Sequence, residues 1–146
     1  MKEPCTIVIF GATGDLSRNK LLPALYHLEA AGRLPEGTRI VASGRRPWQP
    51  LQWQQEARQA IGDKARGGLD ETTFCRFFER SEYFRGDLGE ADLYQGLANL
   101  LADRQRFSAN IIFYMAVSPN AYGPIIEQLS DAGLLQEEDG WRRIVF

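Results

Sequence analysis

Short apolar segments alternate along the chain with longer stretches of helical periodicity. Five segments rich in β-branched and aromatic residues have the length of buried strands. Between them, apolar residues recur every three or four positions, which is the spacing of an amphipathic helix. The predicted strands cover residues 6–10, 39–43, 83–85, 110–116 and 141–146, and the predicted helices cover residues 15–32, 51–66, 71–80, 90–104 and 120–132. This alternation is typical of an α/β domain whose mostly parallel sheet carries helices on both faces.

The first predicted strand leads directly into a turn that contains two glycines. Residues 6–10 run into Gly11, Gly14 follows three positions later, and Asp15 stands where the next helix begins. Such a turn gathers backbone N–H groups at a helix N-terminus, whose dipole favours an anion. The spacing G-x-x-G-x-x-S is looser than G-x-G-x-x-G, so the position between strand and helix carries the prediction. We expect the phosphate-binding turn of a Rossmann-type, doubly wound domain.

Four residues near this turn have individual expected roles. Thr13 offers a hydroxyl and an N–H group inside the turn. Ser17 is small enough for the helix to pack closely against the strand. Asp15 is predicted to cap the helix rather than to contact a ligand, because a carboxylate accepts hydrogen bonds from free N–H groups. Pro23 lies within the helical pattern and is expected to kink the helix or to remove one of its hydrogen bonds.

The residues after the second predicted strand bear on the choice of nucleotide. The segment Ser43-Gly44-Arg45-Arg46 contains no acidic residue. An acid at this point of a dinucleotide-binding domain would bind the ribose 2′-hydroxyl of NAD, whereas an arginine accommodates the 2′-phosphate of NADP. Two solvated surface arginines are the simpler alternative. With the glycine turn upstream, Arg45 favours NADP.

Two further loops follow predicted strands and are expected to border the same crevice. Asp87 and Leu88 come after the third strand, and Ala116, Val117, Ser118 and Pro119 come after the fourth. Ligands of open α/β sheets bind outside the carboxyl ends of the strands. These loops could therefore meet the adenosine and nicotinamide halves of the cofactor, or they could be simple strand exits.

Other conspicuous side chains have structural explanations. His27 lies in the middle of a helix and is expected at the surface rather than as a general base. Phe74, Phe77 and Phe78 recur at helical spacing and are expected in the core. The acidic segment 137–139 is expected to form a solvated turn before the last strand.

Composition narrows the class of protein. The 146 residues suit one domain, with 44% apolar and 25% charged residues, as in ordinary globular proteins. A formal net charge of −2 argues against a nucleic-acid or membrane-surface role. Two cysteines and one histidine are too few for a disulfide framework or a metal centre. The sequence contains no apolar run long enough for a membrane span and no secretory signal pattern, so we expect a cytoplasmic location.

Four segments together resemble the coenzyme domain of the glucose-6-phosphate dehydrogenase family. They are IFGATGDLSRNKLLPALYHL, IVASGRRPW, FYMAVSPNAYGPI and GWRRIVF, in the order of the family. The resemblance implies that residues 1–146 form an NADP-binding domain. It assigns the pyrophosphate to Gly11, Ala12, Thr13, Gly14, Asp15 and Leu16, the vicinity of cofactor and substrate to Lys20, the 2′-phosphate to Arg45, the adenosine side to Asp87 and Leu88, and the nicotinamide side to Ala116, Val117, Ser118 and Pro119.

The sequence departs from the family in the segments that carry proton transfer. The family's Glu-Lys-Pro segment, its Arg-Ile-Asp-His-Tyr segment with the catalytic histidine, and its sugar-phosphate domain are absent from these residues. His27 does not match the catalytic position. The resemblance therefore implies an NADP-binding chain that is inactive alone, with glucose 6-phosphate as a partner only in a full-length enzyme.

Three alternative classes of protein also use a glycine turn or a nucleotide-binding fold. Short-chain reductases resemble one another in a Tyr-x-x-x-Lys pair, and no tyrosine here has a lysine four positions later. A P-loop hydrolase needs a Gly-Lys dipeptide, which is also absent. A non-catalytic NADP-binding sensor or interaction domain stays open. We also expect some self-association, because the last strand should leave a sheet edge and apolar surface uncovered.

Overall fold

A computed structural model of the chain describes residues 3–65 and 67–146 and contains one parallel sheet of five strands. The strands lie in the order β3-β2-β1-β4-β5, and every neighbouring pair is parallel. Their bounds are β1 (Thr6–Phe10), β2 (Arg39–Gly44), β3 (Ser81–Arg85), β4 (Ile111–Met115) and β5 (Arg142–Val145). The order reverses direction between β1 and β4, which is where doubly wound sheets bind ligands. The predicted fold class is confirmed.

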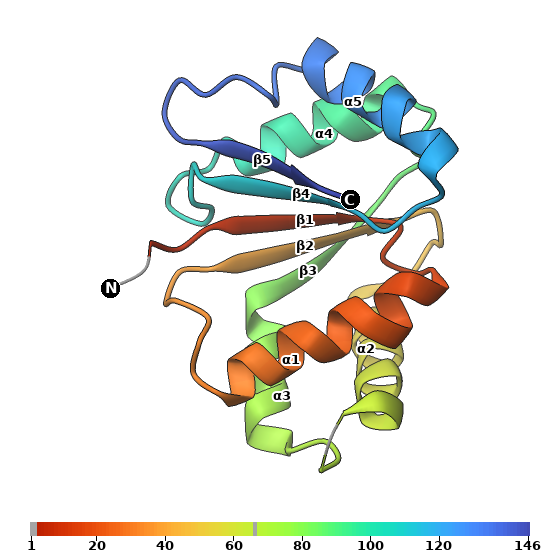
Figure 1. The fold of residues 1–146 in the computed structure, drawn as a ribbon, viewed down its shortest axis with the longest axis vertical. Helices are drawn as coiled ribbons and strands as arrows, with labels where there is room; N and C mark the ends of the chain where they lie inside the picture. Colours follow the sequence, from red (N-terminus) through yellow and green to blue (C-terminus); the bar gives the residue numbers. More distant parts are fainter. Residues whose placement is uncertain (1–2, 66) are drawn as a thin grey trace.

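Helices cover both faces of the sheet. Figure 1 shows α1, α2 and α3 on one side and α4 and α5 on the other. The helices are α1 (Leu22–Ala30), α2 (Pro50–Lys64), α3 (Glu71–Arg80), α4 (Ala91–Leu101) and α5 (Tyr122–Asp131), with a π turn η1 (Ser17–Leu21) before α1 and a 3₁₀ turn η2 (Pro119–Ala121) before α5. The five predicted helices are confirmed: α3 has the predicted bounds, and the others differ at their ends. Residue 66, the predicted end of the second helix, lies outside the described residues.

Alternation along the strands divides the core in two. Ile7 and Ile9 of β1 pack with the α1–α3 side, whereas Val8 and Phe10 pack with the α4–α5 side. Because both faces are covered, all five residues of β1 are buried. The expected aromatic contribution from α3 is confirmed: Phe74 and Phe77 are buried, and Phe78 packs against them while partly exposed.

The first helix contains the disturbance expected at Pro23. Helical hydrogen bonding begins at Asp15, widens into the π turn η1, and returns to α-helical geometry at Leu22. The Leu22 N–H group donates to the Ser17 carbonyl, five residues back. Proline has no N–H group and so cannot donate a helical hydrogen bond. The change from π to α geometry directly before Pro23 places this missing donor at the start of α1, where no regular hydrogen bond is lost.

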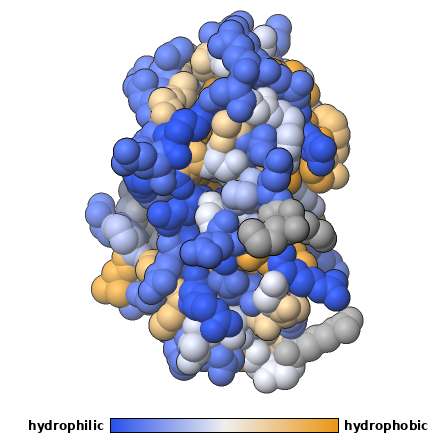
Figure 2. Space-filling model, turned by 90° about the vertical axis from the view of Figure 1, so that its left-hand side faces the viewer, coloured by the Kyte–Doolittle hydropathy of each residue, from blue (hydrophilic) through white to orange (hydrophobic). Residues whose placement is uncertain are grey.

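The two ends of the strands differ in what surrounds them. Figure 2 views the molecule from the side of the amino ends, and hydrophilic residues cover most of that face. The carboxyl ends lie on the opposite side, next to the loops that the sequence analysis singled out. Among residues 3–65 and 67–146, no helix is both long and apolar enough to cross a membrane.

Candidate functional site

Gly11 lies where the loops that follow β1 and β4 meet. Its φ of +80° is a conformation that glycine adopts at no steric cost. A Cβ atom at this position would lie 2.3 Å from the Ala116 carbonyl oxygen and 2.9 Å from Cγ1 of Val117. Both the backbone angle and the close approach therefore require glycine. The predicted turn after β1 and the predicted loop after β4 are in direct contact.

The turn uses several of its own N–H groups. Those of Gly11 and Ala12 donate to the Ser43 carbonyl at 3.1 and 3.0 Å, and that of Gly14 donates to the Gly11 carbonyl at 3.0 Å. The first i to i+4 hydrogen bond of the helix runs from Arg18 to the Gly14 carbonyl at 3.1 Å. Donors for an anion are therefore to be sought after Gly14, at the start of the helix, where N–H groups precede the ladder.

This geometry corrects the role expected for Asp15. Because the Gly14 carbonyl accepts the first helical bond, Gly14 occupies the capping position and Asp15 lies one residue inside the helix. The side chains of Asp15 and Leu16 are exposed. Ser17 is fully buried against the strand, as its small size predicts.

Most of the predicted site residues line one hollow of about 420 Å³ at the carboxyl ends of the strands. The strand exits meet here because parallel strands all end at the same edge of the sheet. Gly44, Asn120 and Ala121 line it as well, although sequence reasoning did not select them. The predicted residues in its lining are Gly11, Thr13, Gly14, Arg45, Asp87, Leu88, Ala116, Val117 and Ser118.

Five predicted residues lie outside that lining. Ala12 is buried beneath the turn, and Lys20 is exposed within η1. Asp15 and Leu16 face solvent on the first helical turn, and Pro119 begins η2. The missed residues Asn120 and Ala121 belong to this same 3₁₀ turn. The Ser-Pro pair before them is a turn signal, but it does not indicate which side chains face the hollow.

A second, shallower hollow of about 370 Å³ adjoins the first at its arginine end. It is lined by Thr13, Gly14, Arg45 and Arg46, and it contains no acidic residue. The Arg46 guanidinium lies 5.9 Å from the ring centre of Trp48. Among residues 3–65 and 67–146, neither arginine forms an ion pair with a carboxylate. Arg45 also lines the first hollow, which includes Asp87, so the positive charge available to an anion lies at the end that Arg45 and Arg46 share with Thr13 and Gly14.

The loop after β3 contributes Asp87 and Leu88 to the wall of the first hollow. The Asp87 side chain accepts a hydrogen bond from the Gly89 N–H group at 2.9 Å, and the Tyr94 hydroxyl donates to the Leu88 carbonyl at 2.7 Å. Burial, together with the charge of Asp87, raises the pKa of Tyr94 to about 12. Tyr94 therefore stays a protonated donor at neutral pH and fixes this wall from α4.

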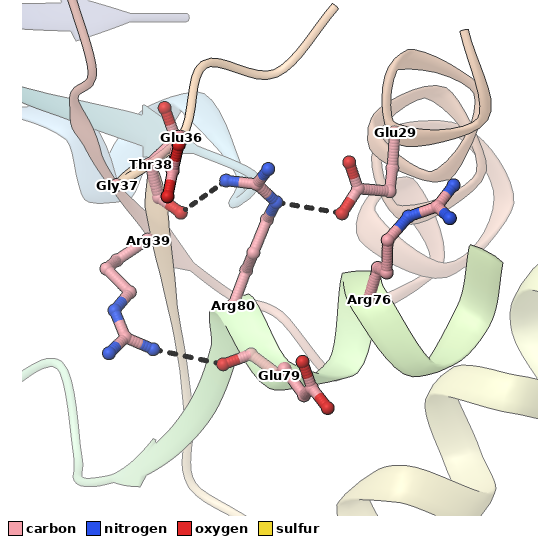
Figure 3. A pocket seen from close by; sticks show the side chains of 8 residues that line it. All are labelled: Glu29, Glu36, Gly37, Thr38, Arg39, Arg76, Glu79 and Arg80. Carbon is pink, nitrogen blue, oxygen red and sulfur yellow. Dashed lines mark hydrogen bonds and ion pairs between the residues drawn. The ribbon is translucent and has the colours of Figure 1, made fainter. Parts of the chain in front are cut away.

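A larger hollow of about 540 Å³ lies at the other end of the sheet, where the chain enters β2. Figure 3 shows Arg80 between Glu29 and the carbonyl of Thr38. Its guanidinium donates to Glu29 at 2.8 Å, to Thr38 at 3.0 Å and to Pro35 at 2.9 Å, and Glu29 is only 4% exposed. These bonds tie α1, α3 and the loop before β2 together. This hollow therefore has a structural explanation, and we place the candidate site at the carboxyl ends.

His27 does not contribute to the candidate site. It lies half-buried in α1, with its ring 5.8 Å from that of Tyr26, and it is not among the residues that line either hollow. The expectation of a surface histidine is therefore correct only in part.

The site has the features that a dinucleotide needs. A crevice at the switch point, a helix N-terminus beside it and two unpaired arginines at one end fit a pyrophosphate and a further anionic group. Gly11 lets the turn lie directly against the Ala116 carbonyl group, where an added Cβ atom would clash. The residues present fit such a group.

Known proteins are similar to this chain in sequence and in fold. A family model described as "Glucose-6-phosphate dehydrogenase, NAD binding domain" matches residues 8–146. Glucose-6-phosphate 1-dehydrogenase of Dickeya dadantii is 34% identical over 135 residues, which are 92% of this chain and 27% of that protein. The Bacillus subtilis enzyme is also 34% identical, over 95% of this chain and 28% of its own length.

Solved structures agree with the sequence matches. The crystal structure of glucose-6-phosphate 1-dehydrogenase from Mycobacterium avium superposes with a TM-score of 0.81 at 31% identity and covers 97% of this chain. This chain in turn covers 29% of that structure, so it spans less than a third of the relatives that it matches. The chain belongs to the glucose-6-phosphate dehydrogenase family and corresponds to its NAD-binding domain.

Proposed function

We propose that residues 1–146 form one dinucleotide-binding domain that holds NADP for a glucose-6-phosphate dehydrogenase. The observation that carries the choice of NADP over NAD is the arginine end of the site. Arg45 and Arg46 line a hollow with Thr13 and Gly14, and no carboxylate is present there to bind a ribose 2′-hydroxyl. An arginine–phosphate contact is charge-assisted and can be bidentate, which favours the 2′-phosphate.

The proposed contacts follow the walls of the crevice. The backbone N–H groups of the first helical residues, Asp15 and Leu16, face the pyrophosphate. Thr13 and Gly14 line the hollow beside it, and Gly11 and Ala12 shape the turn beneath. Asp87 and Leu88 border the adenosine, and Ala116, Val117, Ser118 and Pro119 border the nicotinamide. This assignment is supported by the hollow that eight of these twelve residues line together.

The dehydrogenase activity is proposed for a longer polypeptide. NADP supplies the hydride acceptor, and the protein orients it toward the sugar. A related structure is described as a complex with its substrate glucose-6-phosphate, at a TM-score of 0.80 and 25% identity. We propose that Lys20 lies toward that substrate. A general base must reach the proton that it removes, and His27, the one histidine of the sequence, is outside the site. The 146-residue chain alone should therefore not oxidise glucose 6-phosphate.

Titration of the purified chain with NADP and with NAD tests the proposal. We expect NADP to bind more tightly, and Arg45→Ala to weaken NADP by about tenfold or more while it leaves NAD nearly unchanged. Arg33→Ala is the matched control, because Arg33 is an exposed arginine beyond the far end of α1. Equal affinities for the two nucleotides, before and after the Arg45 substitution, would refute the assignment.

A further inference from the structure

The turn that carries the two arginines is held by the neighbouring strand. Three consecutive carbonyl groups accept hydrogen bonds from β3 and its exit. The Gly86 N–H group donates to Gly44 at 2.9 Å, Nε of Arg85 donates to Arg45 at 3.3 Å, and the Tyr83 hydroxyl donates to Arg46 at 2.7 Å. Since β2 and β3 are parallel neighbours, the two strand exits run side by side. The backbone of this turn is therefore fixed from outside.

The hydroxyl of Tyr83 is itself held in place by aromatic packing. Its ring centre lies 5.5 Å from that of Trp48 and 5.6 Å from that of Trp53. Trp53 is 2% exposed in α2, and its indole N–H group donates to the Ser81 hydroxyl at 3.5 Å. Trp48 also donates its backbone N–H group to the Arg46 carbonyl at 2.8 Å. The phenol thus has little freedom to leave its acceptor.

The same hydroxyl reaches the junction with the glycine turn. A Cβ atom on Gly44 would lie 3.0 Å from the Tyr83 oxygen and 2.8 Å from the Thr13 methyl group. Tyr83, Gly44 and Thr13 therefore meet at one point, and Thr13 lines the hollow together with Arg45 and Arg46. A tyrosine hydroxyl is already protonated at neutral pH, and partial burial raises the pKa of Tyr83 further, so the hydroxyl can donate its hydrogen bond.

We infer that Tyr83 is a positioning residue for nucleotide choice: its hydroxyl fixes the arginine turn so that the guanidinium groups are preorganised for a 2′-phosphate. The inference rests on the proposed function. Arg45 and Arg46 are exposed, and ordering long side chains on a mobile turn would reduce affinity. A turn that is fixed before binding avoids part of that loss. NAD lacks the 2′-phosphate, so its affinity should not depend on this arrangement.

The chain offers a matched control in Tyr94. Its hydroxyl also donates to a backbone carbonyl, that of Leu88, at the same distance of 2.7 Å. That carbonyl belongs to the wall proposed for the adenosine, which NAD and NADP share. Removing the two hydroxyls in turn therefore deletes the same type of bond from two walls of one site.

The experiment measures dissociation constants of NADP and NAD for the wild-type chain, Tyr83→Phe and Tyr94→Phe. Loss of a neutral hydrogen bond should raise a dissociation constant by about three- to tenfold. We expect Tyr83→Phe to weaken NADP by that factor and to leave NAD unchanged, whereas Tyr94→Phe should affect both nucleotides equally. Thermal unfolding of each variant verifies that the fold persists. A purely structural role of Tyr83 would lower the melting temperature without changing the ratio of the dissociation constants of NADP and NAD.

A cycle with the arginines tests the route of the effect. In an Arg45→Ala/Arg46→Ala background, Tyr83→Phe should cause no further loss of NADP affinity, because the groups that it positions are gone. The same loss in that background, or an equal loss for NAD, overturns the inference while the proposed function stands. A wild-type chain without preference for NADP overturns both.

Discussion

Gly11 is the residue on which the candidate site depends most directly. It follows β1 directly, turns the chain with a positive φ, and lies against the carbonyl group of Ala116 at the exit of β4. One atom added here would separate the two walls of the crevice. The residue is therefore a geometric requirement of the site, even though its side chain cannot bind anything.

We predict that Gly11→Ala destabilises the chain by about 2–4 kcal/mol, the sum of a left-handed backbone penalty and of overpacking. Urea denaturation measures the change, and nucleotide affinity should fall with it. Gly62→Ala is the control, because Gly62 lies in α2 with no atom within 4 Å of its added Cβ. That substitution should stabilise by about 0.5–1 kcal/mol. Equal effects of the two substitutions would contradict the role given to Gly11.

Among single residues, those next to strand ends can be predicted from the sequence, whereas those whose side chains hold the neighbouring loops in place cannot. Gly11, Arg45 and Asp87 lie within two residues of the ends of predicted strands. Parallel strands all end at the same edge of the sheet, which brings these residues together. Tyr83 and Tyr94 were not singled out, because their acceptors lie on other segments. Their roles depend on which strand and which helix are neighbours, and periodicity does not determine that.

Among the elements, α3 shows how a local signal can define a helix. Asp70 precedes it, and its carboxylate accepts hydrogen bonds from the N–H and hydroxyl groups of Thr73, both at 2.9 Å. An acidic cap at this position satisfies a free donor and lies favourably in the helix dipole. The predicted bounds, residues 71–80, coincide with the observed helix.

Because a carboxylate accepts these two hydrogen bonds, we predict that the stability contributed by this cap is lost in acid. They hold the pKa of Asp70 below its ordinary value, so their stabilisation is present above the pKa of the unfolded chain and is lost as pH falls through the lower folded value. We expect Asp70→Asn to flatten the dependence of unfolding free energy on pH below about pH 4, since an amide accepts without titrating. Denaturation at several pH values measures this. Asp63→Asn, an exposed position on α2, should keep the wild-type pH dependence, and an unchanged slope in the Asp70 variant would contradict the prediction.

The first helix was harder to predict at the level of the element. Its apolar spacing indicates residues 15–32, but the π turn at Ser17–Leu21 shifts the register by one residue before Pro23. A regular 3.6-residue period therefore describes only the later part, Leu22–Ala30. The position of Lys20 within this irregular turn is the reason why sequence spacing alone does not indicate its direction.

For the whole molecule, the strand order leaves β5 at one edge of the sheet. Val145 and Phe146 are 37% and 64% exposed there, and the Phe146 ring lies 4.7 Å from that of Tyr122. Unpaired strand edges and exposed apolar side chains favour association. The sequence predicts the strand itself, whereas its place at the edge follows from the order of all five strands.

We predict that this 146-residue chain self-associates as its concentration rises. Size-exclusion chromatography with light scattering measures the mass, and Val145→Lys should shift the molecule toward monomer. Leu51→Lys is the control, because Leu51 is 65% exposed on α2, away from that edge. A clean monomer at high concentration, or an equal effect of both substitutions, would speak against association through β5.

The contact between Gly11 and Ala116 also has a consequence for the order of events during synthesis. Gly11 leaves the ribosome long before Ala116, yet the crevice exists only once β4 has docked beside β1. The site for a nucleotide is therefore incomplete until the segment through Ala116 has emerged and folded. The supply of nucleotide stabilises the finished domain by mass action and leaves the early steps of assembly untouched. The abundance of this domain in a cell should accordingly follow nucleotide levels through degradation of the folded domain, and not through its rate of folding.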